Sequence, residues 1–105
     1  MGQTDIITQL QASDFTIDPD QKWQIIVHET IAPIEARLTK VMNHIPREGN
    51  FRDGFSLTFV TDLKDKYYLQ GNYQLMHPQK GALLLFMVPI GPDKEGFIQY
   101  EIIFT

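Results

Sequence analysis

Residues 83–88 read LLLFMV and are apolar at six successive positions. Because successive side chains of a β-strand point to opposite faces, a strand here presents apolar groups on both faces of its sheet. In a single antiparallel layer one face is wet, and exposing Leu84, Phe86 and Val88 forfeits about 1.5–3 kcal/mol for each side chain relative to burial. We therefore expect this strand to be central in its sheet, rather than an edge, and covered on both faces.

Two coverings would satisfy the second face of this strand. One is the N-terminal segment of the same chain, which contains the apolar residues Ile6, Ile7, Leu10 and Phe15. We favour this covering, because most apolar runs belong to a protein's own core. The other is the surface of another polypeptide, either a second copy of the chain or a different protein.

The rest of the chain is organised by alternation of apolar and polar side chains, which is typical of strands. The predicted strands cover residues 23–30, 34–43, 55–61, 71–77, 82–88 and 97–104. The connections after residue 55 are too short for the crossovers that parallel strands require. The sequence therefore predicts a single all-β domain over residues 1–105, an antiparallel β-sandwich or small barrel of about six strands, with at most one short N-terminal helix.

Residues 32–43 carry two competing signals. Apolar and polar residues alternate over 34–38, as in a strand, whereas the Glu, Ala, Arg, Leu, Lys and Met content also favours a helix. We predict a strand, because a short connection joins this segment to the alternating run before it, as in a hairpin. Val41 breaks the alternation, which indicates either a β-bulge near Lys40 or burial on both faces.

Charge and composition argue against several kinds of partner. The first 20 residues hold four aspartates and no lysine or arginine, which accounts for the whole formal net charge of −4. The chain lacks the basic excess of a general nucleic-acid binder, and we interpret the small basic stretch around Arg47 and Arg52 as a solvated loop. No apolar run approaches the ~20 residues of a membrane-spanning helix, and no signal-peptide pattern is present. We expect no nucleic-acid or membrane partner and a cytoplasmic location.

Candidate catalytic residues are few. The chain has no cysteine, and its three histidines, His28, His44 and His77, show no metal-ligand spacing. Phosphate-binding glycine loops and nucleophile elbows are also missing. His28 or His77 would serve a hydrolytic or metal-dependent enzyme only if the fold joined them to carboxylates, and Glu29 and Glu35, beside a predicted turn, are more typical of exposed acids. We predict a non-enzymatic protein without cofactor or metal.

Protein binding is the function that the sequence favours. Tyrosine and phenylalanine are favoured at protein interfaces, and the apolar strand offers further contacts. The candidate interface residues are Leu84, Phe86, Val88, Tyr67 and Tyr68. An alternative is a small-ligand-binding β-barrel, whose cavity would be lined by Trp23, Phe59, Tyr73 and Tyr100.

Four segments of the C-terminal half form a recognisable pattern: FSLTF at 55–59, QGNYQLMHP at 70–78, LFMVPIGPD at 85–93 and YEIIF at 100–104. Together with SDF at 13–15 they resemble a family of small bacterial proteins known as domain of unknown function six-nine-one-six. The resemblance implies a small β-rich protein with no established activity, so no residue inherits a catalytic role. It also implies a loose association with genes for phage tail-collar-like fibre proteins, and hence an accessory or assembly role.

Overall fold

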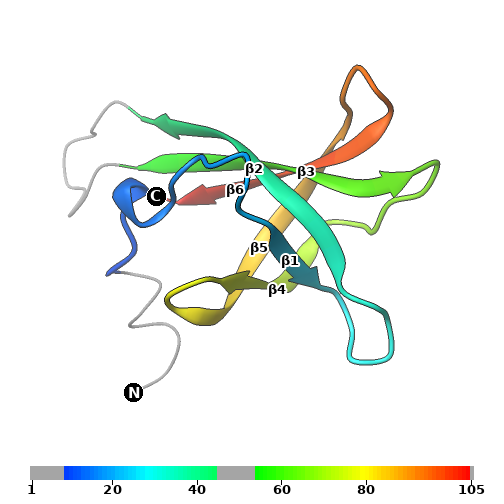
Figure 1. Ribbon diagram of the computed structural model, residues 1–105, viewed down its shortest axis with the longest axis horizontal. Helices are drawn as coiled ribbons and strands as arrows, with labels where there is room; N and C mark the ends of the chain where they lie inside the picture. The colour runs from blue at the N-terminus through cyan, green and yellow to red at the C-terminus, as the bar shows by residue number, and fades with distance from the viewer. Residues whose placement is uncertain (1–8, 45–53, 105) are drawn as a thin grey trace.

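Six antiparallel strands close into a barrel in the computed structural model, which describes residues 9–44 and 54–104 (Figure 1). The order around the barrel is β1-β2-β3-β6-β5-β4, which confirms the predicted all-β antiparallel fold. A short 3-10 turn, η1 at Ala12–Asp14, precedes the barrel, and most of the N-terminal helix predicted before it falls outside the described residues. The strands are β1 (Trp23–Ile26), β2 (Ile34–Asn43), β3 (Phe55–Lys64), β4 (Gly71–His77), β5 (Gly81–Pro92) and β6 (Phe97–Phe104).

Strand β2 resolves the ambiguity of residues 32–43 in favour of a strand. Its antiparallel register with β3 joins Leu38 to Phe59 and Lys40 to Thr58, with a register shift between Leu38 and Lys40. Of the two alternatives that the break in alternation left open, this register shift agrees with an irregularity near Lys40, and the exposure of Thr39 and Lys40 argues against burial on both faces. Cross-strand packing in a closed barrel therefore outweighs the moderate helix propensity of these residues.

The barrel interior is filled by the inward side chains of all six strands, and Phe15 packs across one end. Its ring centroid lies 6.1 Å from the rings of both Trp23 and Phe55 and 5.9 Å from that of Phe104. Phe55 and Phe104 stack on each other with centroids 4.4 Å apart. The aspartate-rich N-terminal segment is therefore held to the barrel through an aromatic cluster.

Strand β5 lies between β4 and β6 and is not an edge of the barrel, as predicted, but the described part of the chain does not itself cover the outer face of this strand. Leu83, Leu85 and Met87 are buried, whereas Leu84 is 44% and Phe86 49% exposed on the outer face. The described part of the N-terminal segment does not cover that face, because Leu10 and Phe15 join the core instead. Ile6 and Ile7 lie outside the described residues.

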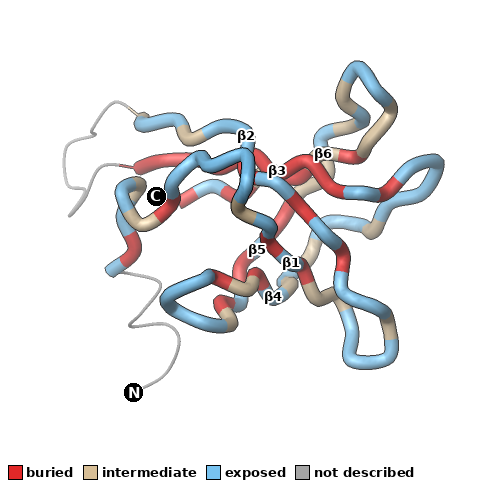
Figure 2. Tube along the Cα trace, viewed as in Figure 1, coloured by how far each residue is buried: buried red, intermediate tan, exposed pale blue. Residues whose placement is uncertain are grey.

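Strand β3 is the strand that is buried on both faces (Figure 2). Its outward residues Ser56, Thr58 and Val60 are buried, as are its inward ones. They lie between β2 and β6. Thr39 of β2 and His44, just after β2, approach them: Thr39 Oγ1 donates to the carbonyl oxygen of Thr58 at 3.2 Å, and His44 Nε2 lies 3.3 Å from Ser56 Oγ. Short side chains in the middle of a sheet are thus covered by their longer neighbours.

Candidate binding groove

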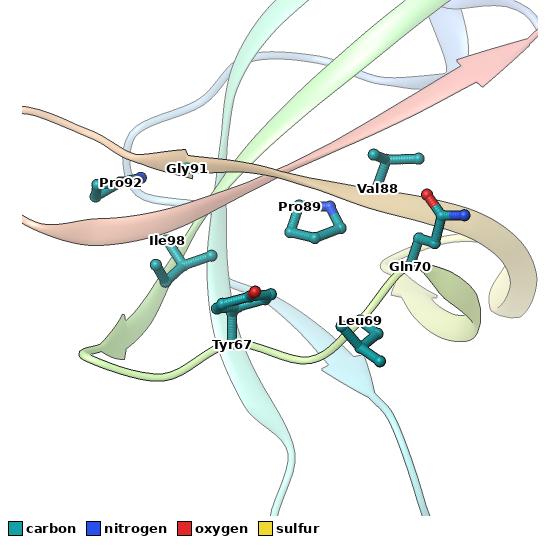
Figure 3. A pocket seen from close by; sticks show the side chains of 8 residues that line it. All are labelled: Tyr67, Leu69, Gln70, Val88, Pro89, Gly91, Pro92 and Ile98. Atoms are coloured by element: carbon teal, nitrogen blue, oxygen red, sulfur yellow. The ribbon is translucent and has the colours of Figure 1, made fainter.

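A groove opens where the pairing between β4 and β5 ends. The last pair of this ladder is Gly71 with Met87, whereas β5 continues to Pro92 and pairs there only with β6. The connection at residues 65–70, which leads into β4, lies outside the ladder and faces this part of β5 across a cavity of about 760 Å³ (Figure 3). The groove therefore follows from the unequal lengths of two neighbouring strands.

The walls of the groove are mostly apolar. The connection contributes Tyr67, Leu69 and Gln70, and the opposite wall consists of Val88, Pro89, Gly91 and Pro92 of β5 with Ile98 of β6 (Figure 3). Tyr67 is 57% and Leu69 72% exposed, which is unusual for side chains of this size. The cavity volume falls in the range of sites that bury small molecules or several partner side chains. Among the residues that the structure describes, no carboxylate, imidazole or amine lines it.

Two tyrosine hydroxyls hold the connection that forms one wall. The hydroxyl of Tyr100 donates to the carbonyl oxygen of Tyr68 at 2.8 Å and accepts from the amide of the same residue at 2.7 Å. The hydroxyl of Tyr73 donates to the carbonyl oxygen of Leu69. Burial raises the pKa of Tyr100, and the hydrogen bond to Tyr68 opposes this shift with a smaller effect. The Tyr100 phenol is therefore neutral and able to donate.

The predicted interface residues fall into three places. Leu84 and Phe86 lie on the exposed outer face of β5, and Val88, half-buried on the same side of the strand, also lines the groove. Tyr67 is exposed in the groove, whereas Tyr68 is half-buried and packs against the core. Val88 thus joins the outer apolar face of β5 to the groove.

Several lining residues were missed by sequence reasoning, namely Leu69, Pro89, Pro92 and Ile98. The strand predicted at residues 82–88 ends at the apolar run, whereas β5 continues through the proline- and glycine-containing stretch to Pro92. Pro89 and Pro92 have no amide N–H, so neither residue can donate a backbone hydrogen bond in this part of β5. The prolines that follow the apolar run are the sequence signal for a part of β5 that has a neighbouring strand on one side only.

The interior cavity predicted for a ligand-binding barrel is occupied by the side chains expected to line it. Trp23, Phe59 and Tyr100 are buried in the core, with the first two packed edge to face at 5.3 Å, and Tyr73 packs against them half-buried. The groove lies elsewhere, between β5 and the connection before β4.

The histidines do not assemble a site. His77 contacts Trp23 at the start of β1, whereas His28 follows the end of β1 and bonds to Thr30. His44 contacts Ser56, as described above. Across residues 9–44 and 54–104, no group of three His, Asp or Glu side chains is placed to hold a metal ion. Glu29 and Glu35 are both exposed, and Arg47 and Arg52 lie outside the described residues.

The fold and the groove together define a class: a small closed antiparallel β-barrel with an apolar groove at the end of one strand ladder. Within it, the chain belongs to the family described as domain of unknown function DUF6916, whose model matches residues 10–104 and confirms the resemblance seen in the sequence. No curated protein and no solved structure matched the chain. Within residues 9–44 and 54–104, no helix has the length and apolar character of a membrane-spanning segment.

Proposed function

We propose that the protein is a non-enzymatic protein-binding module, and that an apolar segment of its partner binds in the groove between Tyr67 and Pro89. The observation that carries this proposal is the groove itself, about 760 Å³ with an apolar lining and two large, mostly exposed side chains on its rim. Concave apolar surfaces of this kind mark binding sites on soluble proteins.

The chemistry of the groove specifies the partner segment. None of the lining residues in the described part of the chain is Lys, Arg, Asp, Glu or His, so a charged side chain entering the cavity would lose its hydration without gaining an opposite charge from them. Pro89 and Pro92 withhold two backbone donors, which disfavours recognition by strand addition. The partner segment therefore inserts uncharged apolar side chains, while the Gln70 amide is available to its backbone.

The outer face of β5 enlarges this surface. Phe86, with half of its surface exposed, lies two residues before Val88 on the same side of the strand. A partner that fills the groove and extends along β5 would cover that face, which is the second of the two coverings considered above. The partner can be a different protein or a second copy of the chain. Its membership of a phage-tail-like fibre stays a prediction, as does the cytoplasmic location.

The test is affinity purification from the native host with matched baits. Leu69→Glu places a charge at the groove, and Ile17→Glu places the same charge at a half-exposed apolar residue outside it. We expect a protein captured by the wild type to be reduced about tenfold with Leu69→Glu, because a buried unpaired charge costs well over 1.4 kcal/mol, and to be retained with Ile17→Glu. The purified pair must reproduce this difference by calorimetry; equal binding of both variants would refute the proposal.

A small apolar ligand is the second candidate, favoured by the cavity volume, which lies within the range of small-molecule pockets. Native mass spectrometry of the purified protein separates the two candidates. A bound small molecule that is released by Leu69→Glu would support the ligand, and an unliganded wild type with a captured protein would support the partner.

A further inference from the structure

The wall of the groove formed by residues 67–70 has no strand to support it. These residues precede β4 and are in neither a strand nor a helix. A free connection of this kind samples many backbone conformations, and a ligand that needs one of them must order it at a cost in affinity. The geometry of the groove therefore depends on whatever fixes this connection.

One side chain takes the place of the missing strand partner. In an antiparallel ladder a residue exchanges its N–H and C=O with the residue opposite. Here the amide and the carbonyl of Tyr68 are both bonded to a single atom, the Tyr100 hydroxyl, at 2.7 and 2.8 Å. The Tyr100 ring is only 2% exposed in the core, so this hydroxyl has a fixed position.

The neighbouring bonds extend this arrangement along the wall. The Tyr73 hydroxyl donates to the carbonyl oxygen of Leu69. Tyr68 is therefore held by a side chain of β6 and Leu69, the next residue of the wall, by a side chain of β4. With the Tyr68 ring packed against the core, the flanking side chains of Tyr67 and Leu69 are left at the groove (Figure 3).

We propose that Tyr100 and Tyr73 are positioning residues, whose hydroxyls preform the groove by fixing the backbone of Tyr68 and Leu69. This inference rests on the proposed function, since it concerns the same groove. Neither hydroxyl needs to contact the bound partner: each acts through the wall, and its removal changes the affinity of the groove by letting the wall move.

The experiment uses the full chain and the uncharged apolar dye Nile red as probe, with affinity measured by fluorescence titration. Leu69→Glu first establishes that the dye binds in the groove. Tyr100→Phe and Tyr73→Phe then each remove one oxygen atom and keep the ring. Thr39→Val is the matched control, because it removes a side-chain hydroxyl that donates to a backbone carbonyl on the β2–β3 side of the barrel.

We expect Tyr100→Phe to weaken dye binding about tenfold and to speed amide hydrogen exchange at Tyr68, while Thr39→Val changes neither. Tyr73→Phe, in a less buried ring, is expected to act in the same direction and provides the test if Tyr100→Phe does not fold. Dye affinity within twofold of the wild type in the folded Tyr→Phe variants would overturn the positioning role alone. A wild type that binds no dye, or binds it regardless of Leu69→Glu, would instead overturn the apolar groove of the proposed function.

Discussion

The Nε2 atom of His77 lies 2.6 Å from the carbonyl oxygen of Asp14, and this hydrogen bond ties the end of β4 to the segment that precedes the barrel. The other ring nitrogen, Nδ1, accepts from the amides of Gln79 and Lys80 at 3.1 and 3.2 Å. Because Nδ1 accepts, the proton lies on Nε2, which donates to Asp14. Both ring nitrogens are therefore used in holding the fold together.

Replacing His77 by alanine is expected to destabilise the protein by about 2–4 kcal/mol, because three backbone groups lose a buried partner at once. Urea denaturation measures the change. His28→Ala is the control, since that imidazole is exposed and bonds only within its own turn, and it should cost less than about 0.5 kcal/mol. Equal costs for the two histidines would contradict the structural role of His77.

The two faces of β5 are expected to respond differently to the same substitution. Leu85→Gln buries an amide among apolar side chains and should cost about 3 kcal/mol or more. Phe86→Gln alters a half-exposed outer position and should cost less than about 1 kcal/mol. Thermal unfolding of both variants provides the comparison, and a severe loss with Phe86→Gln would mean that the outer face is covered after all.

Asp93 organises the turn between β5 and β6. One carboxylate oxygen, Oδ1, accepts from the amides of Glu95 and Phe97, each at 2.9 Å. We expect Asp93→Ala to destabilise the protein by about 1–2 kcal/mol through the loss of these bonds, with faster amide exchange at Phe97. Lys94→Ala, at an exposed neighbouring position in the same turn, should leave both quantities unchanged; the same loss in both variants would contradict the role of the carboxylate.

Tyr100 should make stability depend on pH in the alkaline range. Burial raises the pKa of this phenol above its ordinary value of 10.0, so the folded state holds the proton more tightly than the unfolded chain does. Its contribution is fully present below pH 10 and is lost as the pH rises through the raised pKa. Denaturation series between pH 9 and 11 should show a smaller decline for Tyr100→Phe than for the wild type, and identical declines would contradict the assignment.

Much of the barrel could be predicted because the alternation of apolar and polar residues along the sequence follows directly from the pleat of a β-strand. The alternation of side chains alone predicts the strands at residues 55–61 and 97–104. The break at Val41 left a bulge near Lys40 as one of two alternatives, and the register shifts between Leu38 and Lys40. The short connections then excluded parallel pairing. These features are local, so a single sequence contains them.

The distribution of burial could not be predicted, because it depends on which strands become neighbours. Ser56 and Thr58 are polar residues of the kind found on a solvent-exposed face, yet both are buried on β3, between β2 and β6. Phe86 has the composition of a core residue, yet nothing in the described chain covers it fully. Predicting the groove would also require knowing that the β4–β5 ladder ends at Gly71. That end point depends on the register of the two strands, which composition does not determine.

The prolines of β5 have a consequence for solubility. A strand margin that extends past its partner is a site at which identical chains join edge to edge and begin to form fibrils. Pro89 and Pro92 interrupt the row of amide hydrogens at this margin. We therefore expect this margin of β5 to be a poor template for edge-to-edge aggregation.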